Sequence, residues 1–126
     1  MTFWILVALG LYVFQTLLPP LFRYVLRSDP RILATVGARD DPPETSVYGA
    51  RSERALRNAN EALLVFLPLA LLGSEAEGAR LGAQIFVLAR IAYVPAYLLG
   101  VPVLRSAIWT LGVAGLALMA MALPWP

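Results

Sequence analysis

Cysteine, histidine and lysine are all absent from this sequence of 126 residues. Without cysteine or histidine there is no disulfide, no thiolate nucleophile, no Cys/His metal site and no histidine for acid–base catalysis. Charged residues are also scarce, at 14%, whereas 60% of residues are hydrophobic and the mean hydropathy is +0.72. An ordinary soluble domain is about a quarter charged, so the composition argues against a soluble globular fold. The net charge of only +2 gives no reason to expect nucleic-acid binding.

Long uncharged runs separate the clusters of charged residues. A membrane-spanning helix needs about 20 mostly apolar residues, and the first 22 and last 21 residues contain no charged side chain. Two further uncharged runs lie between them. We therefore expect a single all-α domain over residues 1–126, built as a bundle of four membrane-spanning helices. The expected helices lie at about 2–26, 47–73, 80–99 and 103–123.

The distribution of arginine predicts the orientation of the bundle. The first connection and its flanks carry seven arginines, the third carries Arg105, and the second carries Arg80 alone. Positive charge favours the cytoplasmic side, so the first and third connections are expected in the cytoplasm and both termini outside. The first helix lacks the basic start and the cleavage site of a signal peptide, so we expect it to be retained. A bacterial inner membrane is the expected location.

The second and third helices carry polar residues at membrane depth. At 1.5 Å per residue, Glu61 lies about 18 Å and Arg90 about 15 Å from the outer end of its helix, close to the midplane. An ionisable residue facing lipid costs about 2.5–3.5 kcal/mol or more, so these side chains are expected to face inward. Residues at helical spacing share the same two faces: Arg54, Arg57, Asn58 and Glu61 on one helix, and Arg90, Tyr93 and Tyr97 on the other.

Two interpretations of this polar cluster remain open. Glu61 and Arg90 could form a buried ion pair that only fixes the register of the two helices. Alternatively, the surplus of arginine over carboxylate at the cytoplasmic end indicates a cationic pocket for a ligand that carries carboxylates. Arg105, at the start of the last helix, would belong to that pocket.

Other features are typical of structural roles. Gly112 and Gly115 predict close packing of the last helix. Three tryptophans are expected as anchors at the membrane interface or toward lipid: Trp4, Trp109 and Trp125.

The polar motifs resemble those of the MAPEG superfamily, the membrane-associated proteins in eicosanoid and glutathione metabolism. Arg54, Asn58 and Glu61 follow the pattern Arg-x-x-x-Asn-x-x-Glu. The third helix follows with Arg-Ile-Ala-Tyr-Val-Pro-Ala-Tyr over 90–97, and a short loop leads to Arg105. The resemblance extends from about residue 42 into the last helix and is nearest to small bacterial members.

The resemblance implies a homotrimer that binds glutathione near the cytoplasmic side, between neighbouring subunits. Arg105 would face the thiol of glutathione and act as the catalytic residue, because a guanidinium favours thiolate over thiol. The second substrate would be a lipophilic electrophile that arrives from the bilayer. The implied glutathione-binding residues are Arg54, Arg57, Asn58, Glu61, Arg90, Tyr93, Tyr97 and Ser106.

Three functions therefore compete. The first is a glutathione transferase or peroxidase. The second is a non-enzymatic membrane protein, either an assembly subunit or a binder, which keeps the pocket without the chemistry. The third is a small four-helix exporter of cations, which the sequence disfavours because the first helix has no carboxylate and only Gln15 as a strongly polar residue at mid-span.

Overall fold

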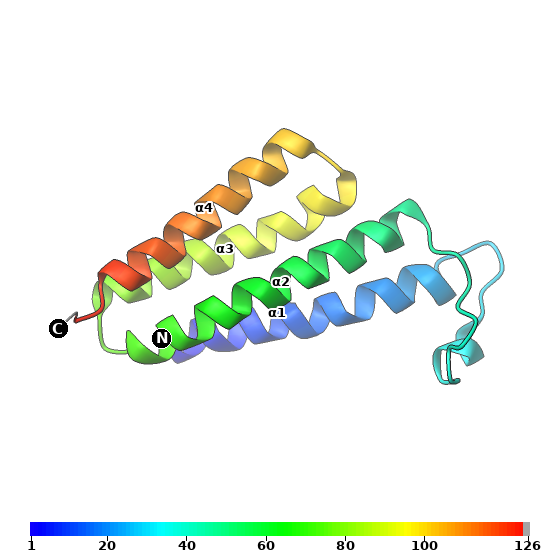
Figure 1. Ribbon diagram of the computed structural model, residues 1–126, viewed down its shortest axis with the longest axis horizontal. Helices are drawn as coiled ribbons and strands as arrows, with labels where there is room; N and C mark the ends of the chain where they lie inside the picture. The colour runs from blue at the N-terminus through cyan, green and yellow to red at the C-terminus, as the bar shows by residue number, and fades with distance from the viewer. Residues whose placement is uncertain (125–126) are drawn as a thin grey trace.

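The computed structural model describes residues 1–124, and these form an antiparallel bundle of four long helices (Figure 1). The helices are α1 (Thr2–Pro20), α2 (Val47–Leu72), α3 (Glu77–Leu99) and α4 (Pro102–Met121). All four are long and apolar enough to cross a membrane, and no strand occurs within 1–124. The predicted all-α fold with four membrane-length helices is confirmed. The N-terminus and the last described residues lie at one end of the bundle, and the long α1–α2 connection lies at the other (Figure 1).

The helices begin and end where local chemistry requires it. The hydroxyl of Ser46 accepts a hydrogen bond from the Gly49 amide at 3.1 Å and caps α2. Gly100 adopts a left-handed conformation with φ of 71° and ends α3, and Pro102 begins α4. The α3 helix starts at Glu77, three residues before the expected position.

The end of α1 differs from a simple helix. A π-helical turn, η1 (Leu21–Val25), continues α1 beyond Pro19 and Pro20. Proline lacks the amide hydrogen that an α-helix requires, so the backbone pairing is disturbed at this point. The expected helix at 2–26 is therefore an α-helix followed by a π-helical turn of larger radius.

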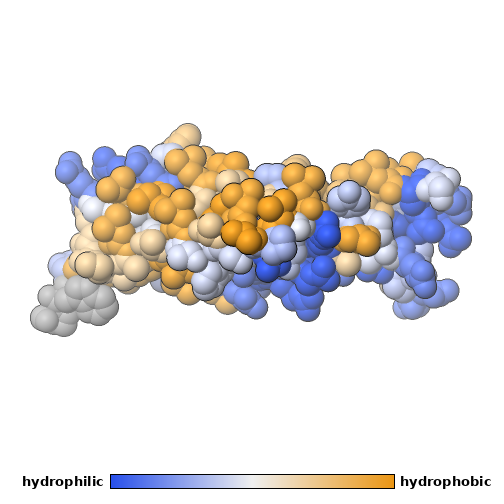
Figure 2. All heavy atoms as spheres, turned by 90° about the horizontal axis from the view of Figure 1, so that it is seen from above, coloured by the Kyte–Doolittle hydropathy of each residue, from blue (hydrophilic) through white to orange (hydrophobic). Residues whose placement is uncertain are grey.

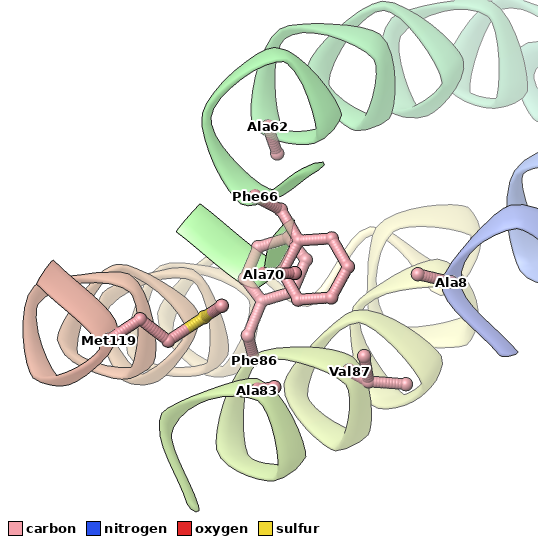
Figure 3. Close-up of a cluster of buried hydrophobic side chains, with 8 residues drawn as sticks. All are labelled: Ala8, Ala62, Phe66, Ala70, Ala83, Phe86, Val87 and Met119. Atoms are coloured by element: carbon pink, nitrogen blue, oxygen red, sulfur yellow. The ribbon is translucent and has the colours of Figure 1, made fainter. Parts of the chain in front are cut away.

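A small apolar core lies toward the end of the bundle that holds the termini. The rings of Phe66 on α2 and Phe86 on α3 stack with centroids 4.6 Å apart, and both are buried (Figure 3). Met119 of α4 packs beside them, and Trp4 packs against the same cluster from α1. Trp4 thus contributes to packing. Alanines and one valine fill the remaining space (Figure 3): Ala8, Ala62, Ala70, Ala83 and Val87.

Two glycines bring α3 and α4 into backbone contact beside this core. A Cβ on Gly82 would lie 2.6 Å from the carbonyl oxygen of Gly115, and a Cβ on Gly115 would lie 2.8 Å from that of Gly82. Neither position tolerates a side chain without movement of the backbone. The predicted close packing at Gly115 is confirmed, whereas a Cβ on Gly112 would make only ordinary contacts, the nearest at 3.7 Å.

The outer surface of the bundle is largely apolar. Leucines and other large hydrophobic residues of all four helices are exposed, including Leu6, Leu64, Leu88 and Leu111 at 53–70%. Apolar residues cover much of the face drawn in Figure 2, and hydrophilic residues gather in its middle and at both ends. Large apolar side chains on the outer surface of the helices suit a lipid environment. Trp125 lies outside the described residues.

Candidate functional site

A polar groove runs between α2, α3 and α4 toward the α3–α4 turn. Its main part has a volume of about 470 Å³, and a second hollow of about 190 Å³ shares Asn58 and Trp109 with it. The main part is lined by Asn58, Tyr93, Tyr97, Arg105, Ser106, Trp109 and Thr110. The second hollow adds Glu61, Ala62, Arg90, Val113 and Leu116. We call both parts together the polar groove.

Arg90 is held in place by three neighbours. Its Nη1 donates a hydrogen bond to Oδ1 of Asn58 at 2.5 Å, which joins α3 to α2. Its guanidinium carbon lies 5.1 Å from the centroid of the Tyr93 ring and 5.4 Å from that of Phe86. A guanidinium within about 6 Å of an aromatic face is attracted to it. Arg90 is therefore a fixed cation at the inner end of the polar groove.

Glu61 does not pair with Arg90 as the first interpretation required. The ion pairs within the described residues are Arg23–Glu53 and Arg31–Asp29. Asn58 lies one helical turn before Glu61, and the guanidinium of Arg90 donates to the Asn58 amide oxygen. Glu61 stays exposed at the edge of the groove, where its carboxylate is available to a ligand.

Arg105 lies at the other end of the groove, in the first turn of α4. Its amide donates to the carbonyl of Val101 at 3.0 Å, and its guanidinium carbon lies 5.2 Å from the centroid of the Tyr97 ring. The rings of Tyr97 and Tyr93 are themselves 5.4 Å apart. Two guanidinium groups thus flank a pair of tyrosines, with Arg90 beyond Tyr93 and Arg105 beyond Tyr97.

Seven of the nine predicted site residues line the polar groove, and two do not. Arg57 lines a separate hollow of about 430 Å³ between α1 and α2, together with Tyr12 and Asn60. Consecutive residues of a helix point about 100° apart, so Arg57 faces away from its neighbour Asn58. Arg54 is exposed on α2, one turn before Asn58.

Trp109 and Thr110 are groove residues that the sequence analysis did not assign to the site. They follow Arg105 and Ser106 by four residues each, so they share the same helix face. That spacing is the signal that could have found them. Trp109, expected as a membrane anchor, lines the polar groove while it remains 43% exposed.

Arg51 was also missed, and it acts from outside the groove. Its Nη1 donates to the carbonyl oxygen of Leu98 at 2.8 Å, at the C-terminal end of α3. A cation is favourable at that end of a helix. The guanidinium lies so close to Gly100 that a Cβ there would be 2.5 Å from it. Arg51 therefore holds the turn that sets the start of α4 and the position of Arg105.

The comparisons with known proteins give one match. A model of the MAPEG family matches residues 1–125 of the chain. No curated protein and no solved structure matches it.

Proposed function

The chain belongs to the MAPEG family and is an integral membrane protein, and from this premise we propose that it binds glutathione in the polar groove and joins it through its sulfur to lipophilic electrophiles, or uses it to reduce lipophilic peroxides. The observation that carries the proposal is the arrangement of Arg90, Tyr93, Tyr97 and Arg105 along one wall of the groove. Two fixed cations separated by two hydroxyl groups suit an elongated anionic ligand.

The chemistry of glutathione fits the residues of the groove. The tripeptide has a carboxylate at each end, one ammonium group and a central thiol. Arg90 and Arg105 offer cations, and the exposed carboxylate of Glu61 offers a partner for the ammonium group. Tyrosine, serine and threonine hydroxyls can bond the peptide groups between them. Arg54 would contact the ligand from outside the groove, one turn beyond Asn58.

Arg105 is the residue we assign to the thiol. A guanidinium beside the sulfur stabilises the thiolate and lowers the pKa of the thiol from its reference value near about 8.5. In a transfer reaction the thiolate sulfur forms a bond to an electrophilic carbon, and the leaving group departs with the electron pair. In a peroxidase reaction the sulfur attacks a peroxide oxygen, the O–O bond breaks to give an alcohol and a sulfenic acid, and a second glutathione gives the disulfide and water.

A homotrimer would complete the site. The polar groove lies between α2, α3 and α4, and the second polar hollow, at Arg57 and Asn60, lies between α1 and α2. Polar groups at membrane depth need protein or water around them. Copies of the chain around a common axis could cover both surfaces, and Arg57 would then reach the ligand of a neighbouring subunit.

We also propose a bacterial inner membrane, with the groove facing the cytoplasm and both termini outside.

The test is the ultraviolet absorbance of thiolate when purified protein in lipid nanodiscs is mixed with glutathione at neutral pH. We expect a thiolate signal in the native protein and its loss in Arg105→Ala. Calorimetry with S-methylglutathione, which has no ionisable thiol, measures binding alone. Binding without a thiolate signal in the native protein would favour a non-enzymatic binder. Absence of binding would contradict the proposal altogether.

A further inference from the structure

The connection between α1 and α2 presents three large apolar side chains that are mostly exposed. They lie in and beside the short 3₁₀-helix η2 (Ile32–Thr35). Ile32 is 60% exposed, Leu33 90% and Val36 86%. These residues lie outside the membrane-length helices, so the exposure of a lipid-facing helix does not account for them.

Contacts with η1 hold this segment in one place. The amide of Arg31 donates to the carbonyl of Tyr24 at 2.8 Å, and the guanidinium carbon of Arg39 lies 5.8 Å from the centroid of the Tyr24 ring. Nη1 of Arg23 donates to the carbonyl of Pro43 at 3.3 Å. The connection therefore contacts η1 at three points: at Arg31 before η2, and at Arg39 and Pro43 after it. The fold itself therefore keeps the apolar side chains outward.

The segment lies beside the end of a membrane-length helix. The connection leaves the end of η1 and turns back, so that η2 lies beside the end of α1 rather than farther along the bundle (Figure 1). At that level a lipid bilayer changes from acyl chains to headgroups. When the bundle spans a membrane, lipids of that leaflet would surround an element that projects sideways at this level.

The charged residues nearest to η2 in the sequence are arginines, and Asp29, Asp40 and Asp41 lie outside them. Between Asp29 and Asp40 the segment carries Arg31 and Arg39 and no acidic residue. Both arginines are exposed. Arg31 also contacts Asp29 at 3.4 Å, but an exposed pair of this kind contributes little. Apolar side chains between arginines are typical of elements that lie in a membrane interface.

We infer that residues 31–39 form an interfacial anchor, in which Ile32, Leu33 and Val36 enter the leaflet and Arg31 and Arg39 contact lipid phosphates. This inference does not depend on glutathione binding. It assigns the segment to the lipid bilayer, and not to a neighbouring copy of the chain or to a soluble partner. The anchor would fix the depth at which η1 and the end of α1 lie in the membrane.

The absence of native cysteine allows a direct test. Single variants Leu33→Cys, Val36→Cys and, as a control in the same connection, Asp41→Cys are spin-labelled. The labelled proteins are reconstituted into vesicles of phosphatidylethanolamine and phosphatidylglycerol. The relaxation of each label is measured with oxygen, which concentrates in the bilayer, and with a water-soluble nickel chelate.

We expect the labels at 33 and 36 to be more accessible to oxygen than to nickel, and the label at 41 to show the reverse. Nickel access at 33 and 36 equal to that at 41 would place the segment in water and overturn the inference. Protection of 33 and 36 from both reagents would mean that protein covers them, and would also overturn it. Circular dichroism of each labelled variant confirms that its helices are intact.

Discussion

The same three helices pack closely together at one end of the bundle and are separated by a groove at the other. Toward the termini, α2, α3 and α4 close around Phe66 and Phe86, and Gly82 and Gly115 let two backbones touch. Toward the α3–α4 turn, the polar groove separates α2 from α4. Helices in lipid associate through close packing of small residues and through polar contacts. At the closed end the helices associate through close packing of small residues. Beside the groove they associate through a polar contact, the hydrogen bond between Asn58 and Arg90.

This comparison shows how a small membrane protein can hold a site open. Backbone contact at one end fixes the crossing of α3 and α4. The open end can then carry large polar side chains without loss of the fold. The following predictions test whether the two ends have these separate roles.

The largest effect is expected from Arg105→Ala at the open end. Loss of one group that stabilises developing charge lowers turnover by about 100- to 1,000-fold, while the affinity for glutathione should change much less. Without the cation the pKa of the thiol rises toward about 8.5. The part of the pH–rate profile in which the rate increases with pH therefore moves to higher pH. Steady-state kinetics with an electrophilic substrate measure both effects.

Arg80→Ala is the matched control for that prediction. Arg80 is an exposed arginine near the start of α3, at the closed end. Its replacement should leave turnover and the pH–rate profile unchanged. If Arg105→Ala reduced affinity and turnover equally, the assigned role of Arg105 would be wrong.

The next effect concerns the contact between α2 and α3. Asn58→Leu leaves the half-buried guanidinium of Arg90 without its partner, and the free energy of unfolding should fall by about 2–3 kcal/mol. The double variant with Arg90→Met should recover most of this loss, because no unpaired charge remains. Denaturant titration in detergent measures the change. Asn60→Leu, on an exposed position of α2, is the control, and an equal loss there would remove the special role of Asn58.

At the closed end, Gly82→Ala should lower the free energy of unfolding by about 1–3 kcal/mol. The new methyl group would collide with the backbone of α4 at Gly115. Gly10→Ala serves for comparison, since a Cβ there would meet nothing within 4 Å. That variant should gain up to about 0.5–1 kcal/mol from better helix propensity. Equal behaviour of the two variants in thermal unfolding would show that α3 and α4 do not touch.

The smallest effect is expected from Arg51→Ala, which removes a cation from the C-terminal end of α3. The loss should be no more than about 1 kcal/mol. Because the turn before Arg105 becomes less well held, the thiolate signal should also weaken, while binding of S-methylglutathione stays constant. Arg80→Ala, which removes an exposed arginine at the other end of α3, is the control and should leave the thiolate signal unchanged. An unchanged thiolate signal in Arg51→Ala would limit Arg51 to a structural role.

Much of the fold could be predicted because its determinants are local. The positions of the four helices follow from apolar length between charge clusters, and their limits follow from residues such as Ser46, Gly100 and Pro102. Helical spacing likewise placed Asn58, Tyr93 and Tyr97 on inward faces. Pro19 and Pro20 remove two backbone donors from α1, but the π-helical turn that follows depends on how the backbone restores its hydrogen bonds.

The sequence by itself determined which segments span the membrane and which polar residues must avoid lipid, because length and hydropathy act within each helix. Tertiary structure decided which residues are partners. The relative rotation and approach of α2 and α3 pair Arg90 with Asn58 and not with Glu61. The contact of Gly82 with Gly115, and of Arg51 with the end of α3, also required the helices to be placed against one another. Each of these contacts joins residues far apart in the chain, so no local pattern specifies them.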